Sequence, residues 1–257
     1  MNKNPFVTHT YETWQAFLGD NQYFADDMGF VFRGHGCSEW ILETSLDRLL
    51  SRLSPQGIDL DSTYDFLLKE FIHSIRSRSG VKKDELLNDS EIWSLGQHYG
   101  LATPLLDWSK SLYVALFFAF ENHEPSKKSF RSIWALNLCP FVREAITEFN
   151  KQKEEKQHFK IIDPISDENM RLIAQTGIFS RQPLKFSIVE WVKENLPPDA
   201  PYLIKINIPE SERLSILRHL RLMNIHHGTL FPDVEGAAKY CNHTLELLTD
   251  KRKFVKK

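Results

Sequence analysis

The segment Leu112–Phe120 constrains the fold of this chain more than any other stretch. It consists of nine apolar residues in a row, LYVALFFAF, with neither the alternation of a half-buried strand nor a single helical face. Nine residues are too few to cross a bilayer as a helix. Ser109 or Ser111 can cap the segment, because a hydroxyl oxygen accepts from the free N–H groups of a first helical turn. We therefore expect a short helix that is buried on all sides.

The polar residues just before this segment are the first candidates for a site. Asp107, Ser109 and Lys110 would lie at the N-terminal end of the expected helix. Such an end offers unpaired N–H groups and partial positive charge, which suit an anion such as a phosphate. A carboxylate at position 107 would repel a phosphate. We therefore expect Asp107 to position Arg33, which needs a partner near a buried helix, and to leave the cationic role to it.

The composition is that of an ordinary globular protein. The chain has 257 residues, is 42% hydrophobic and 26% charged, and carries a formal net charge of -2. This balance gives no electrostatic reason to expect a nucleic acid or a membrane as partner, although it is compatible with a local basic groove. The N-terminal residues do not resemble a signal peptide, and no apolar run is long enough to span a bilayer, so we expect no membrane partner.

The cysteines predict neither a disulfide framework nor a metal site. Cys37, Cys139 and Cys241 are far apart and odd in number, which is typical of a reducing compartment, and we expect a cytoplasmic location. No CxxC pair occurs, and the histidines between positions 226 and 243 do not have a standard ligand spacing with a cysteine. We therefore expect no metal.

Hydrophobic periodicity predicts helices interleaved with short strands. We expect helices over residues 10–18, 46–53, 61–78, 90–99, 112–120, 140–150, 186–196, 211–223 and 237–248, with a break at residues 54–57. Strands are expected over residues 30–33, 132–138, 159–162 and 202–208, a strand or turn over 170–183, and a strand or loop over 224–232. Because no linker divides these elements, we expect a single α+β domain over residues 1–257, with helices in the majority.

Two motifs in this chain resemble the FRG domain family. The first is Phe32-Arg33-Gly34, the three residues that give the family its name, and the second is the long motif WSLGQHYGLATPLLDW at residues 93–108. Further pieces of the resemblance are residues 115–120, QTGIF at 175–179 and GTLFPD at 228–233. The likeness therefore runs over a core of about residues 11–248.

The resemblance implies both a fold and an activity. FRG domains are remotely similar to ADP-ribosyltransferases, and many occur in bacteria and phages in settings that suggest defence or toxicity. This implies short mixed strands that form a split, NAD-binding core, with NAD as a substrate. Arg33 would then grip the NAD, Asp107, Trp108 and Ser109 would occupy the strand-to-helix position, and Asp233 or Glu235 would be the late acidic residue.

Cleavage of NAD at the ribose–nicotinamide bond passes through an oxocarbenium-like state. It needs a grip on the phosphates, a platform for the nicotinamide ring, and a carboxylate that steadies the positive charge. Arg33 can supply a forked cation for a phosphate or ribose, and Gly34 lets the backbone come close to a ligand. The alternative for Arg33 is a strand-end arginine paired with a local carboxylate. His98 can donate to a ribose or diphosphate, or satisfy the end of a helix.

The remaining residues of the central motif also have alternative roles. Asp107 can hold Arg33, cap the buried helix or touch the ligand, and we favour the pairing with Arg33. Trp108 can stack on a base or on nicotinamide, or belong to the core. Thr103 can bond backbone in a turn or face the pocket. Gln175 can hydrogen-bond an amide such as nicotinamide, or serve in the turn before Gly177.

The acidic turn near the C-terminus offers the carboxylate that the chemistry requires. Asp233 is the better candidate, and its alternative is an N-cap for the helix that follows Pro232. Glu235 would then be a first-turn acid that complements the helix dipole. His226 and His227 can reach the pocket or lie in a surface loop.

Together, these patterns predict an NAD-binding FRG-domain enzyme. It would transfer ADP-ribose to a macromolecule, with a protein or nucleic acid as acceptor, or hydrolyse NAD, and it could be a bacterial or phage-defence effector. The alternative is a non-catalytic regulatory module that binds a nucleotide or a protein in the same pocket. A toxin that acts on nucleic acid is a third hypothesis, which the near-neutral charge disfavours.

Overall fold

The structure is a computed structural model that describes residues 4–26, 29–53, 60–76, 88–123, 129–163 and 170–251. These residues contain a sheet of seven strands in the order β1-β7-β4-β2-β3-β6-β5. The strands are β1 (Phe6–Thr10), β2 (Phe30–His35), β3 (Leu105–Ser109), β4 (Phe130–Asn137), β5 (Lys160–Ile162), β6 (Gly177–Arg181) and β7 (Leu203–Pro209). β1 pairs in parallel with β7, and the other neighbours are antiparallel, so the predicted mixed sheet is confirmed.

The sheet is nearly divided between β2 and β3. β2 pairs with β4 along all six of its residues, from Phe30 to His35. With β3 it shares only the register pair Phe32–Ser109. β3 in turn pairs with β6 over its whole length. The likeness of this divided sheet to an ADP-ribosyltransferase core stays a prediction.

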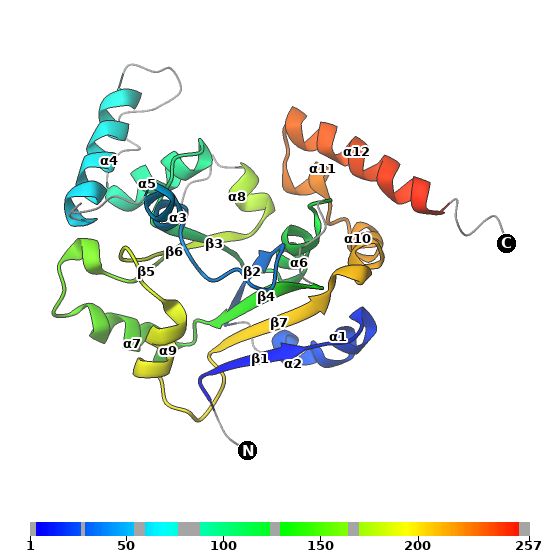
Figure 1. Ribbon diagram of the computed structural model, residues 1–257, viewed down its shortest axis with the longest axis horizontal. Helices are drawn as coiled ribbons and strands as arrows, with labels where there is room; N and C mark the ends of the chain where they lie inside the picture. Colours follow the sequence, from blue (N-terminus) through cyan, green and yellow to red (C-terminus); the bar gives the residue numbers. More distant parts are fainter. Residues whose placement is uncertain are drawn as a thin grey trace.

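Helices surround the sheet and outnumber its strands in the described part of the chain (Figure 1). In Figure 1, α3, α4 and α5 lie towards β3 and β6, whereas α10, α11 and α12 lie at the opposite end, with α8 between the two groups. The helices are α1 (Trp14–Asp20), α2 (Gln22–Asp26), α3 (Ser45–Leu53), α4 (Leu60–Ile75), α5 (Asp89–His98), α6 (Leu112–Phe120), α7 (Pro140–Asn150), α8 (Met170–Ala174), α9 (Ile188–Asn195), α10 (Arg213–Leu222), α11 (His227–Leu230) and α12 (Val234–Lys251). No helix within these described ranges is both long and apolar enough to cross a membrane.

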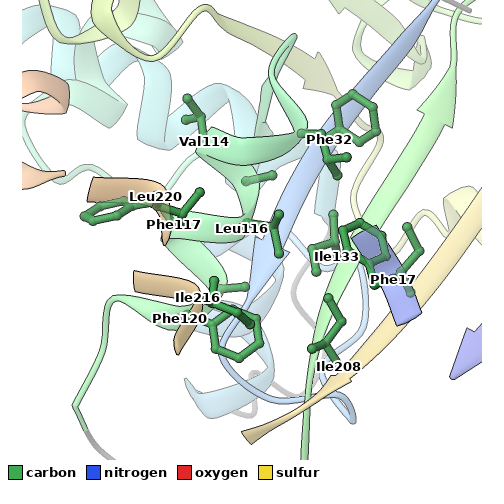
Figure 2. Packing of buried hydrophobic residues seen from close by; sticks show 14 of the residues in the cluster. Phe17, Phe32, Val114, Leu116, Phe117, Phe120, Ile133, Ile208, Ile216 and Leu220 are labelled. Atoms are coloured by element: carbon green, nitrogen blue, oxygen red, sulfur yellow. The ribbon is translucent and has the colours of Figure 1, made fainter. Parts of the chain in front are cut away.

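Helix α6 has the bounds and the burial that the apolar run predicts. Ser111 is its N-cap, and the hydroxyl oxygen accepts from the Val114 N–H at 3.4 Å. Seven of its residues are buried. Its side chains pack against Phe32 of β2, Ile133 of β4 and side chains of α1, β7 and α10 (Figure 2). Deleting a side chain from such a close-packed centre typically costs 2–5 kcal/mol.

Gly34 allows β2 to approach the backbone of α6. A Cβ at this position would lie 2.5 Å from the Ala119 nitrogen and closer still to the Ala115 carbonyl oxygen. Real Cβ atoms do not tolerate such approaches. Although Gly34 borders the cavity described below, the backbone that comes close to it is therefore that of a helix.

Several sequence predictions need correction where long-range pairing or capping decides the structure. Residues 10–18 are not one helix, because Thr10 ends β1 and Thr13 caps α1. Asn88, not Ser90, is the N-cap of α5. Residues 224–232 contain α11, in which the Thr229 hydroxyl oxygen accepts from the His226 N–H. The predicted break at residues 54–57 lies outside the described residues, and the single-domain assignment stays a prediction.

Candidate functional site

A cavity of about 420 Å³ borders the divide between β2 and β3. Its walls come from β2, β3, β6, α5, α6 and α8, and from Phe231 just after α11. This volume is typical of a small-molecule site. Seven of the predicted site residues border it: Arg33, Gly34, His98, Asp107, Trp108, Ser109 and Gln175. Thr103, Asp233 and Glu235 are not among its lining residues.

Arg33 projects from β2 and is held by groups on two strands. Its Nη1 donates to the Asp107 carbonyl oxygen at 2.8 Å and lies 3.4 Å from Asp107 Oδ2. Its Nε donates to His35 Nε2 at 3.2 Å. Burial lowers the pKa of the Arg33 guanidinium from its usual value, and the Asp107 charge opposes this shift. The predicted pairing of Arg33 with Asp107 is confirmed.

His35 fixes the other side of the guanidinium. Because Nε2 accepts from Arg33, the proton of the neutral ring lies on Nδ1, which can donate to the Trp40 carbonyl oxygen at 3.3 Å. The indole N–H of Trp134 also points at Nδ1, at 3.2 Å, but a protonated Nδ1 cannot accept it. Burial, followed by the Arg33 charge, lowers the pKa of His35 from 6.5 to about 3. The ring therefore stays neutral and available to Arg33 at physiological pH.

Gln97 connects α5 to this pair. Its side-chain N–H donates to Asp107 Oδ1, and its carbonyl oxygen accepts from the Thr103 hydroxyl. Thr103 is fully buried, and its backbone exchanges hydrogen bonds with the Ser45 hydroxyl. Thr103 therefore holds the Gln97 side chain in place. It does not line the cavity, whereas a cofactor-binding role would require it to do so.

The alternation of β3 separates the side chains of the central motif. Asp107 is exposed, whereas Trp108 belongs to a buried core cluster and donates from Nε1 to Ser180 Oγ at 2.9 Å. Trp108 therefore takes the core role that the sequence offered as the alternative to stacking on a ligand. Ser109 donates to the Gln175 carbonyl oxygen at 2.8 Å and accepts from the Ser111 N–H at 3.0 Å. It joins the end of β3 to the start of α6 and to the turn before β6.

His98 and Gln175 line the cavity from α5 and from the residues just after α8. His98 ends α5, is exposed, and packs edge-on against Tyr99 with 4.9 Å between ring centroids. Gln175 follows α8, and its side-chain N–H donates to the Leu230 carbonyl oxygen at 3.1 Å. Gln175 thereby ties α8 to α11.

Glu121 is a lining residue that sequence reasoning missed. It directly follows α6, and its Oε2 lies 2.9 Å from Nε2 of the buried His227. Its carbonyl oxygen accepts from Arg213 Nη2 at 3.0 Å and from His243 Nε2 at 2.9 Å. The one signal for Glu121 in the sequence is its position, as the first charged residue after the apolar run.

Arg171 of α8 is a second lining residue that the sequence did not indicate. Its guanidinium pairs with both carboxylates of the acidic turn. Its Nε donates to Asp233 Oδ2 at 2.6 Å, and its Nη2 lies 3.1 Å from Glu235 Oε2. Asp233 Oδ1 accepts from the Gly236 N–H at 2.8 Å, which confirms the N-cap alternative. Glu235 also pairs with Lys239 at 2.8 Å.

These contacts keep both carboxylates of the acidic turn ionised. The Gly236 N–H, followed by Arg171, lowers the pKa of Asp233, and Lys239, followed by Arg171, lowers that of Glu235. Asp233 raises the pKa of Arg171; burial opposes this shift, and Glu235 adds to it. Asp233 and Glu235 thus contact Arg171 without lining the cavity. The charged groups of the lining are two guanidiniums, Arg33 and Arg171, and two carboxylates, Asp107 and Glu121.

Residues 28–128 match the family model of the FRG domain. The chain therefore contains an FRG domain over these residues, which hold β2, the motif at 93–108 and α6. The pieces at 175–179 and 228–233 lie outside the match, although Gln175 and Phe231 border the same cavity. No curated protein and no solved structure matches the chain.

Proposed function

We propose that the cavity binds NAD and that the chain is an ADP-ribosyltransferase-like enzyme, which transfers ADP-ribose to a macromolecule or hydrolyses NAD. The observation that carries the proposal is a forked cation, Arg33, and a carboxylate, Glu121, on one cavity of about 420 Å³. A guanidinium suits a diphosphate, and a carboxylate suits ribose hydroxyls and an oxocarbenium-like centre. Gln97 and Gln175 border the same space and add amide groups.

Aromatic side chains supply the platform that Trp108 does not. Phe118 of α6 and Phe231 both line the cavity, and their rings meet edge to face with centroids 6.0 Å apart. Aromatic rings attract cations through their faces, and the oxidised nicotinamide ring is a cation. This pair therefore supports a nicotinamide position near Glu121, three residues after Phe118 on the same helical face.

The test is nicotinamide release from NAD by the purified chain, together with transfer of label from a tagged NAD to lysate proteins, nucleic acid or the chain itself. We expect turnover that falls at least about tenfold in Arg33→Gln, because the diphosphate loses its charged hydrogen-bond donors. Arg52→Gln is the matched control, since Arg52 is exposed at the end of α3 and does not line the cavity. A wild-type chain that turns over no NAD with any lysate contradicts the enzyme proposal.

The second candidate function is a regulatory module that binds a nucleotide or protein without turnover. One observation favours it: both guanidiniums of the cavity already have carboxylate partners, Arg33 with Asp107 and Arg171 with Asp233 and Glu235. Binding that is lost in Arg33→Gln but survives in Asp233→Ala and Glu235→Ala, without nicotinamide release, would support this module.

For cellular context we propose a cytoplasmic effector with a toxin or phage-defence role. All three cysteines are free, which supports a reducing compartment. Expression that depletes cellular NAD and arrests growth would support this role. An equally expressed Arg33→Gln chain should leave growth and NAD unchanged.

A further inference from the structure

The carboxylate of Glu121 is fixed by a buried histidine. A carboxylate can only accept, so His227 Nε2 carries the proton of the 2.9 Å hydrogen bond to Glu121 Oε2. The ring packs against Phe117 and Phe231, and only 6% of its side chain is exposed. Its other nitrogen, Nδ1, is buried and has no hydrogen-bond partner in the described part of the chain. The polar contact of this ring is therefore directed at Glu121.

The backbone of Glu121 is fixed as well, while its side chain stays open to the cavity. Arg213 and His243 both donate to its carbonyl oxygen, and Arg213 pairs with another acid, Glu246. The Glu121 side chain is 28% exposed and lines the cavity. A carboxylate held at two points and open to a cavity is preorganised for a ligand.

Glu121 differs in its partners from the other acids at this site. Asp107 pairs with Arg33, whereas Asp233 and Glu235 pair with Arg171. Within the described ranges, Glu121 has no lysine or arginine partner for its carboxylate. Its charge is therefore the one that a cationic part of a ligand can neutralise.

We propose that Glu121 is the catalytic carboxylate and that His227 positions it; this inference rests on the proposed NAD-cleaving function. The bond between ribose C1′ and the nicotinamide nitrogen breaks, and its electron pair leaves with neutral nicotinamide. Glu121 stabilises the positive charge that develops on the ribose. A water oxygen, or an acceptor oxygen in the transfer reaction, then bonds to C1′, and its proton passes to Glu121 and on to solvent.

Glu121→Gln is the direct test, because glutamine keeps the size of the side chain and can still accept from His227 through its carbonyl oxygen. Glu194→Gln on α9 is the matched control, since Glu194 is exposed and outside the lining. We expect nicotinamide release to fall about 100-fold in Glu121→Gln and to be unchanged in the control.

Titration calorimetry with NAD and NADH separates charge recognition from folding. The dihydronicotinamide of NADH is neutral, so the wild-type chain should bind NAD at least about threefold more tightly than NADH. Glu121→Gln should lose most of this preference, keeping only what the Phe118–Phe231 pair contributes, while still binding NADH as the wild type does. A variant that keeps both wild-type turnover and the preference for NAD overturns this inference alone. A wild-type chain that neither binds nor cleaves NAD overturns the proposed function, and this inference with it.

The positioning role of His227 has its own readout. His227→Phe keeps a planar aromatic ring but removes the donor, so kcat should fall about tenfold while KM stays within about twofold. His227→Gln places an N–H near the position of Nε2 and should restore most of kcat. Equal loss in both variants at unchanged KM would assign His227 a packing role only.

Discussion

Arg33 is held by three contacts before any ligand arrives. The Asp107 carbonyl oxygen and carboxylate take one nitrogen, and His35 takes another. A guanidinium fixed in this way loses little conformational freedom on binding, which favours affinity. The Asp107 carboxylate offsets part of the Arg33 charge, so the cavity does not attract anions strongly. At the residue scale the site is therefore suited to a ligand with charges of both signs.

The buried His35 predicts a loss of stability in mild acid. The unfolded chain binds a proton at His35 near pH 6.5, whereas the folded chain does not until about pH 3. Between these values the unfolded state binds more protons, so the free energy of unfolding should fall by up to about 1.4 kcal/mol per pH unit from this residue. Urea unfolding at pH 6.5, 5.5 and 4.5 measures the slope.

His35→Gln provides the comparison for this slope. Glutamine can accept from Arg33 but does not titrate. The free energy of unfolding of the variant should therefore fall less steeply with acidification than that of the wild type, by about 1.4 kcal/mol per pH unit, which corresponds to nearly one proton. Other acid-sensitive groups, such as His243, whose pKa burial lowers, contribute to both chains equally. The same slope in both proteins would show that His35 is not the buried neutral group described above.

At the scale of elements, the contact between β2 and α6 sets the shape of the site. Gly34 lets the strand lie against the helix backbone, and the same strand carries Arg33 into the cavity. The helix ends at Phe120, which puts Glu121 on the cavity wall. Both proposed functional groups therefore depend on one packed pair of elements.

Gly34→Ala should destabilise the protein by about 3 kcal/mol or more, because a Cβ would overlap the Ala115 carbonyl oxygen and the Ala119 nitrogen. Gly36→Ala is the control, since its Cβ would meet Trp40 ring atoms at 3.7 Å and the Ala119 carbonyl oxygen at 3.9 Å, which are ordinary van der Waals distances. We expect a change below about 1 kcal/mol there. Chemical denaturation measures both variants, and similar losses would contradict the close packing of β2 on α6.

The start of α5 offers a second test at this scale. Asn88 accepts from the Glu91 N–H at 3.1 Å, whereas Ser90 lies within the first turn. Asn88→Ala should lower the free energy of unfolding by about 1 kcal/mol, and Ser90→Ala by less than about 0.5 kcal/mol. The reverse order would return the cap to Ser90, as the sequence predicted.

At the scale of the whole molecule, local sequence patterns predicted individual helices and strands. Most contacts between residues far apart in the chain were not predicted. The apolar run defined α6, and Pro140 marked the start of α7, because burial and proline geometry act over a few residues. The strand β1, by contrast, exists through its pairing with β7, and its sequence FVTHT has no clear alternation.

The candidate site shows the same division. The motif around residues 32–34 and 93–108 predicted Arg33, Asp107 and their pairing. Nothing local marked Arg171, whose place on the cavity wall depends on contacts of α8 with β6 and α11. Asp233 was a site candidate because it is an acidic residue near the C-terminus, and an N-cap role was the equal alternative. The structure shows the N-cap role, since its carboxylate accepts from the Gly236 N–H.

The central claim is that the cavity beside β2 and β3 is an NAD site, and titration calorimetry with NAD tests it most directly. We predict one NAD bound per wild-type chain, binding at least about tenfold weaker in Arg33→Gln, and wild-type affinity in Arg52→Gln. Equal NAD affinity in the wild type and Arg33→Gln, or no heat of binding in the wild type at millimolar NAD, would contradict the account.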